Sequence, residues 1–270
     1  MQLMKKFYLL AVLLLGATLT GYADGKNAAP CEPFGLKRAT TATPRENPAA
    51  AKKTGWHRRY DACRQQIAKG GVEIVFIGDS ITHFWEKDAA KDKRRFGGLA
   101  TFKKYFSNYN VLNLANAGDR TQHAVWITSD SKLLDNIDPK LVVIMIGTNN
   151  LSGKPQNKDS EEAIAAGISK VVSNVRTKLP NAKVLVFGIF PRSANAKHHN
   201  RKKIITINNI IRKLADDKNV FYCDITAQLL KADGNLSKEI MPDYLHPNDK
   251  GYEVWANAML PYVHKFVGKK

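Results

Sequence analysis

The motif "VFIGDSITHFW", residues 75–85, contains the first group in this chain whose position could support chemistry. Ser80 follows an apolar run and the turn residues Gly78 and Asp79, so we expect a buried strand to end directly before it. Two roles fit this position: a nucleophile at the edge of a sheet, or a helix N-cap whose side-chain oxygen accepts a backbone N–H group. Position alone does not choose between them.

A serine hydroxyl becomes an effective nucleophile when an imidazole takes its proton and a carboxylate orients that imidazole. The segment "PDYLHPNDKGY" contains His246, with Asp243 three residues before it, just ahead of an expected final helix. If the loop curls back on itself, His246 can accept a proton through one ring nitrogen and donate through the other to Asp243. The same spacing also suits a simple turn with an exposed histidine.

Acyl transfer also needs hydrogen-bond donors where the negative oxygen of the tetrahedral intermediate forms. Gly118 in "NAGDRT" can present its backbone N–H, and Asn149 in "GTNN" can offer its side-chain amide. The backbone N–H of Ser80 would be the third donor. Taken singly, Gly118 suits a turn and Asn149 a loop or cap. Together with the serine, the histidine and the acid, they favour a catalytic interpretation.

The elements that would position these groups alternate between strand and helix. Apolar runs predict strands at residues 73–77, 110–114, 141–146, 183–187 and 220–223. Helical patterns lie near residues 56–70, 121–134, 160–179, 200–218 and 248–267. Uninterrupted apolar strands separated by helices predict a parallel sheet covered on both faces. Functional groups in such a sheet gather at the carboxyl ends of the strands, where Ser80, Gly118 and Asn149 are expected.

The chain contains four blocks that resemble the motifs of the GDSL, or SGNH, hydrolase family: "FIGDSIT", "NAGDRTQHAVW", "VVIMIGTNN" and "DYLHPNDKGY". The resemblance runs from Trp56 to the C-terminus. It is closest to the branch of platelet-activating-factor acetylhydrolase catalytic subunits and bacterial sugar-ester esterases. It implies a flavodoxin-like three-layer α/β/α domain with a parallel sheet of about five strands, and no metal or organic cofactor.

Motif by motif, the resemblance implies Ser80 as nucleophile, His246 as base and Asp243 as its orienting acid. It implies Ser80, Gly118 and Asn149 as the oxyanion donors. The block before Gly118 is commonly more glycine-rich than the "ANAGD" found here, which narrows the freedom of this loop. The basic stretches at residues 87–104 and 192–203 are not family signatures, and we expect both to border the pocket and to contribute to specificity.

Other residues near these motifs have different expected roles. His83 lies about one helical turn after Ser80, too close to approach the hydroxyl in line, and is expected on an exposed helix or at the pocket rim. Asp79 is expected to hydrogen-bond within its turn, and Arg120 either to pair with an acid or to meet substrate. His198 and His199 are expected in a solvated loop. Trp85 and Trp126 are expected in the hydrophobic core.

The N-terminal part of the chain predicts export. Residues 1–23 have the pattern of a cleaved signal peptide, with Lys5 and Lys6 before an apolar run, residues 7–19, that is too short to span a membrane. Residues 24–55, rich in Ala, Thr, Pro and Lys, predict a flexible linker, and residues 56–270 the hydrolase domain. We therefore expect a secreted or periplasmic protein without a lipobox or a stable membrane anchor.

Export would place the three cysteines in an oxidising compartment. Cys31 and Cys63 are the expected disulfide pair, with three reduced thiols as the alternative. Cys223 is expected to be buried at the end of a strand. No Cys/His spacing suited to zinc is present, so we expect no structural metal.

The formal net charge is +18, and removing the two lysines of the predicted signal leaves 18 − 2 = +16 for the mature chain. Basic residues cluster at residues 87–104 and 197–203. They either attract an anionic partner, such as an acidic polysaccharide, a phospholipid surface or a nucleic acid, or form a solvated surface. No nucleic-acid-binding module accompanies the charge, so nucleic acid is not the expected partner.

These observations predict a serine esterase that releases a short acyl group, above all acetyl, from a glycan or similar polar substrate, through an acyl-enzyme. Three alternatives stay open. A lipase or lysophospholipase would be expected to have an apolar lid. A non-catalytic glycan-binding module on the same fold would be expected to lack Ser80, Asn149 or His246. A phosphate- or nucleotide-binding domain would be expected to have more glycine residues in the loop around Gly78. The sugar and the oligomeric state are left open.

Overall fold

The computed structural model describes residues 32–270. The predicted signal peptide, the first part of the predicted linker and Cys31 lie outside the described residues. Within this described range, no helix has the length and apolar character needed to cross a membrane.

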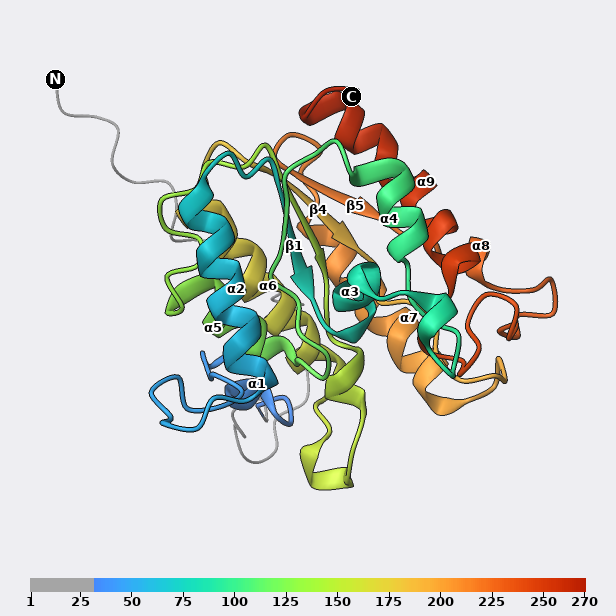
Figure 1. Cartoon of the computed structure of the whole chain (residues 1–270). Helices are drawn as coiled ribbons and strands as arrows, with labels where there is room; N and C mark the ends of the chain where they lie inside the picture. Colours follow the sequence, from blue (N-terminus) through green and yellow to red (C-terminus); the bar gives the residue numbers. More distant parts are fainter. Residues whose placement is uncertain (1–31) are drawn as a thin grey trace, which may run out of the picture. The chain divides into compact units, whose positions relative to one another are not determined.

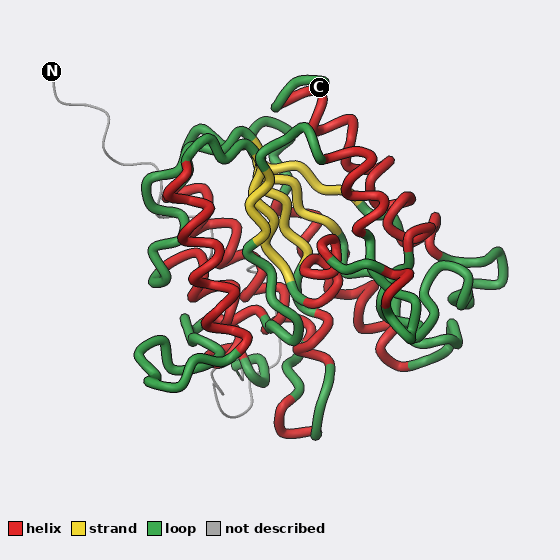
Figure 2. The backbone as a smooth tube through the Cα atoms, viewed as in Figure 1, coloured by secondary structure: helices red, strands yellow, loops and turns green. Residues whose placement is uncertain are grey.

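Five parallel strands form the centre of the fold (Figures 1 and 2). They are β1 (Ile74–Gly78), β2 (Val111–Asn113), β3 (Leu141–Met145), β4 (Lys183–Phe187) and β5 (Val220–Cys223). Their order in the sheet is β2-β1-β3-β4-β5, and each neighbouring pair runs parallel. This is the flavodoxin-like order, so the predicted fold class is confirmed.

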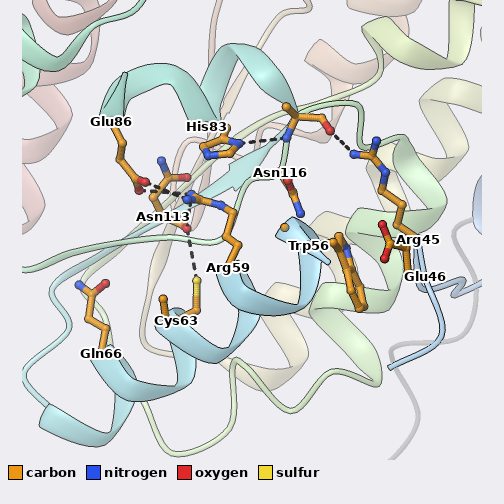
Figure 3. Close-up of a pocket in the computed structure, with 13 residues that line it drawn as sticks. Arg45, Glu46, Trp56, Arg59, Cys63, Gln66, His83, Glu86, Asn113 and Asn116 are labelled. Atoms are coloured by element: carbon orange, nitrogen blue, oxygen red, sulfur yellow. Dashed lines mark hydrogen bonds and ion pairs between the residues drawn. The ribbon is translucent and has the colours of Figure 1, made fainter. Parts of the chain in front are cut away.

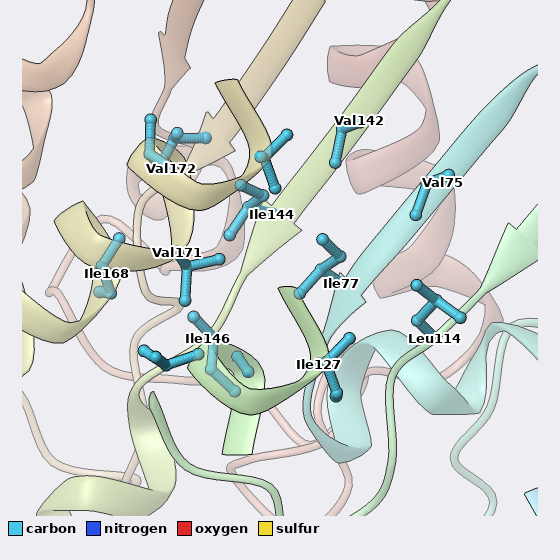
Figure 4. Close-up of a cluster of buried hydrophobic side chains, with 14 of the residues drawn as sticks. Val75, Ile77, Leu114, Ile127, Val142, Ile144, Ile146, Ile168, Val171 and Val172 are labelled. Atoms are coloured by element: carbon cyan, nitrogen blue, oxygen red, sulfur yellow. The ribbon is translucent and has the colours of Figure 1, made fainter. Parts of the chain in front are cut away.

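Alternate residues of each strand face opposite sides of the sheet and contribute to two separate cores. Val75 and Ile77 in β1, with Val142 and Ile144 in β3, belong to the first core (Figure 4). The helices that cover this face are α2 (Gly55–Lys69), α5 (Thr121–Ser129), α6 (Glu161–Lys178) and α7 (His199–Ile211).

The second core lies on the opposite face and is rich in aromatic side chains. Its helices are α3 (Ser80–His83), α4 (Leu99–Phe106), α8 (Thr226–Leu229) and α9 (Asp249–Phe266). Trp85 is fully buried, with its ring centroid 4.5 Å from that of Tyr252 and 5.1 Å from that of Trp255. Trp126 is buried in the first core, beside Trp56. The prediction of core packing for Trp85 and Trp126 is therefore confirmed.

The five strands and the five helices that the sequence predicts are all present, but several of their ends differ by one residue or more, and helix α4 was not predicted. The bounds of β4 and β5 are those predicted. Helix α5 stops at Ser129 rather than at residue 134, because a turn follows in which Lys132 adopts a positive φ of 62°. Helix α7 ends at Ile211 and continues as a 3-10 helix, Arg212–Leu214. The remaining short elements are α1 (Leu36–Thr40) and the 3-10 helices Phe84–Glu86, Ala89–Lys91, Thr148–Leu151 and Pro155–Asn157.

The predicted linker needs correction, because residues 33–55 pack against the domain. Helix α1 contacts α6, and its Ala39 is fully buried. Arg38 donates from Nε to the buried carboxylate of Asp159 at 2.9 Å. Asp159 also accepts from the side chain of Asn150 at 2.8 Å. Composition did not reveal this packing, because it depends on single long-range contacts rather than on a periodic apolar face.

Replacing Arg38 with Met should lower the free energy of unfolding by about 1–3 kcal/mol, because Asp159 would stay buried without its cationic partner. Urea denaturation measures the change. Arg58→Met is the matched control, since Arg58 lies on the exposed surface of α2 and donates only at 3.3 Å to the Lys53 carbonyl oxygen. Equal stabilities of the two variants would argue against a structural role for residues 33–55.

Candidate active site

The turn after β1 places Ser80 at the first position of α3. Asp79 caps this helix, because its Oδ1 accepts a hydrogen bond from the backbone N–H of Ile81 at 3.0 Å. The Asp79 side chain is fully buried, and Ser80 is only 7% exposed. The predicted structural role of Asp79 is confirmed, and the Ser80 hydroxyl is not needed as the cap.

Ser80, His246 and Asp243 form a continuous hydrogen-bonded series. The Oγ of Ser80 lies 2.8 Å from Nε2 of His246. The other ring nitrogen of His246, Nδ1, lies 2.6 Å from Oδ2 of Asp243. The second Asp243 oxygen accepts from the backbone N–H groups of His246, at 2.7 Å, and Leu245, at 3.1 Å. The loop therefore curls back on itself, as the Asp243 and His246 spacing required.

The charge of Asp243 fixes the tautomer of His246. Burial acts to raise the pKa of Asp243, but hydrogen bonds from the side chain and backbone of His246 outweigh it and bring the pKa below its usual value. An ionised Asp243 favours the proton on Nδ1 of His246. Nε2 is then the nitrogen that can accept the proton of Ser80.

Two phenylalanine rings, stacked on each other, pack against the imidazole of His246. Its ring centroid lies 4.7 Å from that of Phe96 and 5.2 Å from that of Phe84, and the two phenylalanines stack at 5.2 Å. The N–H of Gly97 donates to the carbonyl oxygen of Pro247 at 3.1 Å. The basic stretch at residues 87–104 therefore borders the site, as the sequence predicted, and holds the histidine loop in place.

Several basic side chains of this stretch have local partners. Lys87 pairs with Asp92 at 2.5 Å, and its Nζ lies 3.8 Å from the ring centroid of Phe96. Lys104 pairs with Glu253 of α9 at 2.8 Å. Part of the high positive charge thus has a structural role next to the site.

The expected oxyanion donors follow three neighbouring strands, β2, β1 and β3. Gly118, after β2, has a φ of 89°, a left-handed conformation that strongly favours glycine. Asn149, after β3, donates from Nδ2 to the carbonyl oxygen of Asp119 at 2.8 Å, one residue beyond Gly118. Because an amide nitrogen carries two hydrogens, the second is available to a substrate oxygen. Ser80 and Asn149 follow β1 and β3, the two strands at the switch point of the sheet, and the hydrogen bond from Asn149 to Asp119 brings the Gly118 loop next to Asn149.

Arg45 is a residue near the site that was not predicted from the sequence. Arg45 belongs to the predicted linker, yet it donates to the carbonyl oxygen of Ala117 and lies 3.8 Å from the buried carboxylate of Asp119. A Cβ atom on Gly118 would come within 2.8 Å of its guanidinium group. The residues next to Arg45 in the sequence form no motif. Its positive charge was therefore the only sequence feature that could have indicated a role at the site.

Arg192 was also missed, although it opens the second basic stretch at residues 192–203. Its Nη1 donates to the carbonyl oxygen of Thr148 at 2.9 Å and to the hydroxyl of Ser152 at 2.7 Å. It therefore braces the loop after β3 that carries Asn149. Its position directly after Phe190-Pro191, at the end of a predicted strand, was the sequence feature that could have indicated a role near the site.

The structure places the other candidates at the edge of the site or away from it. His83 lines a pocket, and its Nδ1 accepts from the N–H of Ala117 at 3.1 Å, which confirms its rim position. Arg120 donates to carbonyl oxygens, including that of Ser152 at 3.0 Å, and forms no ion pair with an acid among residues 32–270, so its contact with substrate stays a prediction. His198 lies in the bend before α7 and caps that helix, whereas His199 is its first residue, so the prediction of a loop is wrong for His199.

The two cysteines in the described range differ in burial. Cys63 is buried, and its thiol lies 3.6 Å from the carbonyl oxygen of Asn113. Cys223 is half-buried at the end of β5 rather than fully buried. Burial raises the pKa of each thiol to about 11, which keeps both protonated. The pairing of Cys31 with Cys63 stays a prediction. Among residues 32–270, no three His, Cys, Asp or Glu side chains group closely enough to hold a metal ion.

Asp79 carries an unusual charge state for a helix cap. Burial raises its pKa to about 7, opposed by the hydrogen bond from Ile81 and reinforced by the nearby Asp119 carboxyl. One of its oxygens, Oδ2, is buried without a hydrogen-bond partner in the described part of the chain. Near neutral pH, Asp79 is therefore partly protonated in the folded protein.

Comparisons with known proteins agree with the fold and with the motifs of the sequence. The model of the GDSL-like Lipase/Acylhydrolase family matches residues 76–254. The human platelet-activating factor acetylhydrolase IB subunit alpha1 is 32% identical over 190 residues, which cover 69% of this chain and 73% of that protein. A GDSL-like lipase from Bacteroides thetaiotaomicron has a similar structure, with a TM-score of 0.61, 17% identity and coverage of 78% of this chain and 98% of that one. A variant of an acetyl-xylooligosaccharide esterase from Geobacillus gives a TM-score of 0.53, 17% identity and coverage of 72% and 94%.

The variant Asp79→Asn keeps a side chain that can accept from Ile81 but cannot ionise. Because the folded pKa of about 7 lies above the ordinary Asp value, ionisation destabilises the wild-type fold as pH rises from about 4 to about 7. The stability of the wild type relative to Asp79→Asn should fall over this range, by at most about 4 kcal/mol at about 1.36 kcal/mol per pKa unit. Melting temperatures across this range measure the difference. The exposed Asp130→Asn variant is the control, and a pH-independent difference for Asp79→Asn would contradict the raised pKa.

Proposed function

The chain belongs to the GDSL-like lipase/acylhydrolase family, and from this premise we propose that it is a secreted serine esterase that removes acetyl or other short acyl groups from carbohydrate esters. Hydrolysis of acyl esters follows from the family. The serine mechanism, the short acyl group, the carbohydrate and secretion are our proposal. The observation that carries the mechanism is the 2.8 Å contact between Ser80 Oγ and His246 Nε2, with Asp243 on the opposite ring nitrogen.

The first half-reaction forms an acyl-enzyme. Ser80 Oγ attacks the carbonyl carbon of the ester while His246 Nε2 takes its proton, and Asp243 stabilises the imidazolium. The backbone N–H groups of Ser80 and Gly118 and the amide of Asn149 donate to the oxyanion. The tetrahedral intermediate then breaks its bond to the alcohol oxygen, which leaves with the proton from His246.

The second half-reaction releases the acid. His246 takes a proton from a water molecule as the water oxygen attacks the acyl carbonyl carbon on Ser80. The second tetrahedral intermediate breaks its bond to Ser80 Oγ, which regains the proton from His246. The free carboxylic acid leaves, and the enzyme returns to its starting state.

Relatives and the surface of the protein support a short acyl group on a polar substrate. The human relative is named an acetylhydrolase, and the Geobacillus neighbour an acetyl-xylooligosaccharide esterase. Among the described residues, the exposed large apolar side chains are Phe34, before α1, and Ile205 and Ile210, on α7. None of them lies in the loops that carry Ser80, Asn149 and His246, where a lipid-binding enzyme would be expected to expose apolar surface.

Secretion rests on the sequence alone. The basic and apolar pattern of residues 1–23 is that of a signal peptide. A secreted location suits an enzyme acting on a polysaccharide, which does not enter the cell intact.

The variant Ser80→Ala should lose hydrolysis of 4-nitrophenyl acetate by about 10³-fold or more, because no nucleophile remains. The melting temperature should change little, since Asp79 rather than Ser80 caps α3. Ser173→Ala, on the exposed surface of α6, is the matched control and should keep full activity. A fluorophosphonate probe should label Ser80 in the wild type, whereas retained activity in Ser80→Ala would overturn the serine mechanism.

The length of the acyl chain tests the choice between an acetyl esterase and a lipase. An apolar groove would gain about 0.8 kcal/mol for each buried CH₂ group, about fourfold in kcat/KM. We expect kcat/KM for 4-nitrophenyl esters to fall from acetate to octanoate, because the loops around Ser80 expose no large apolar side chain. A rise with each added CH₂ would favour a lipase or lysophospholipase.

A further inference from the structure

A pocket of about 470 Å³ lies beside the Ser80 site, between α2 and the loops that follow β2 and α3 (Figure 3). This volume falls within the range of about 300–1,000 Å³ typical of ligand sites. Its lining contains none of Ser80, Asn149 and His246. The proposed ester chemistry therefore leaves this pocket without a role.

Two residues connect the pocket to the reacting groups. His83, in its wall, is the last residue of α3 and lies about one helical turn after Ser80. Its Nδ1 accepts from the N–H of Ala117, the neighbour of Gly118. Arg45 extends from the opposite wall to the carbonyl oxygen of Ala117 (Figure 3). A molecule in this pocket would therefore lie next to the oxyanion loop.

The pocket contains a buried amide with unused hydrogen-bonding capacity. Asn116 is 8% exposed, and its Nδ2 has no hydrogen-bond partner within residues 32–270. Figure 3 shows its side chain directed into the space in front of α2. A buried donor without a partner destabilises the fold, because the donor has lost its hydrogen bond to water. A ligand oxygen that accepts from Asn116 would recover this free energy.

The other polar groups supply both donors and acceptors. Because Nδ1 of His83 accepts from Ala117, its proton is on Nε2, which is a donor. Burial and the nearby Arg59 lower the pKa of His83 to about 4, so the ring stays neutral. Glu46 and Glu86 present carboxylate oxygens to the same pocket.

The formal charges of the pocket wall balance. Arg59 and Glu86 form an ion pair at 2.8 Å, and Arg45 and Glu46 contribute one charge of each sign. A phosphate or carboxylate ligand would meet two carboxylates here. Hydroxyl groups, which both donate and accept, match this lining better.

We propose that this pocket binds a neutral sugar unit of an oligosaccharide, next to the acylated unit whose ester reacts with Ser80. The inference rests on the proposed function and extends it to the part of the substrate that is not cleaved. Asn116 and His83 donate to sugar hydroxyls, Glu46 and Glu86 accept from them, and Trp56 contributes apolar surface.

The variant Ala62→Phe tests this assignment, because Ala62 is an exposed residue of α2 on the pocket wall. The larger side chain would fill part of the pocket without entering either core. Ala68→Phe, an exposed position of the same helix outside the pocket lining, is the matched control. For each variant, kcat/KM is measured with an acetylated xylo-oligosaccharide and with 4-nitrophenyl acetate, which carries no sugar.

We expect the ratio of the oligosaccharide kcat/KM to the aryl-ester kcat/KM to fall about tenfold in Ala62→Phe relative to Ala68→Phe, equivalent to about 1.4 kcal/mol of lost binding. Equal ratios in the two variants would overturn the assignment of the pocket and would leave the proposed esterase function intact. If the wild type cleaves the aryl ester but releases acetate from no oligosaccharide, the carbohydrate part of the proposed function fails instead. A preference for an acetylated oligogalacturonide that Ala62→Phe removes would overturn the choice of a neutral sugar.

A second variant, Asn116→Leu, separates binding from structure. It removes the unpaired donor at nearly constant volume, so the melting temperature should rise or stay constant while the oligosaccharide-to-aryl-ester ratio falls. A lower melting temperature with an unchanged ratio would show that Asn116 serves the fold and would overturn its role in binding.

Discussion

The hydrogen bond between Ser80 and His246 joins positions 166 residues apart, and it forms only if both faces of the sheet pack correctly. Ser80 is placed by β1 and the Asp79 cap, whereas His246 belongs to the loop before α9. The hydroxyl of Tyr252 in α9 donates to the carbonyl oxygen of Ile81 at 2.5 Å and ties this helix to α3. The packing of the aromatic core around Trp255 therefore affects the distance between Ser80 Oγ and His246 Nε2.

The segment before α2 supports the other half of the site. Asp159, paired with Arg38, also accepts from the side chain of Asn150, whose Oδ1 accepts from the N–H of Thr121 at 3.0 Å. Asn150 is the direct neighbour of Asn149, and Thr121 begins the helix after Gly118. One buried polar network thus connects residues 33–55 to both loops that would stabilise an oxyanion.

The sequence was sufficient to predict the sheet and the positions of Ser80, Asp243 and His246, because strands covered on both faces are continuous apolar runs and the four motifs have fixed places at their ends. It was not sufficient to predict the contacts of Arg45 or Phe96. Each depends on one side chain reaching a distant loop, and no periodicity records such a contact. Helix α4 was missed because its basic residues obscured the apolar spacing of Leu99, Phe102 and Phe106.

The buried acids near Ser80 indicate how the proposed active site would tolerate a developing negative charge. Asp79 and Asp119 are both buried, burial raises the pKa of each, and the Asp119 carboxyl further raises that of Asp79. With its pKa raised to about 7, Asp79 is partly protonated near neutral pH, and a protonated carboxyl repels an oxyanion much less than a carboxylate does. Arg45 lies 3.8 Å from Asp119, and Arg192 carries its charge near Asp79. Under the proposed serine mechanism, the raised pKa of Asp79 and the nearby cations would act in the same direction, since both would make the potential around Ser80 more favourable for the transition state of acyl transfer.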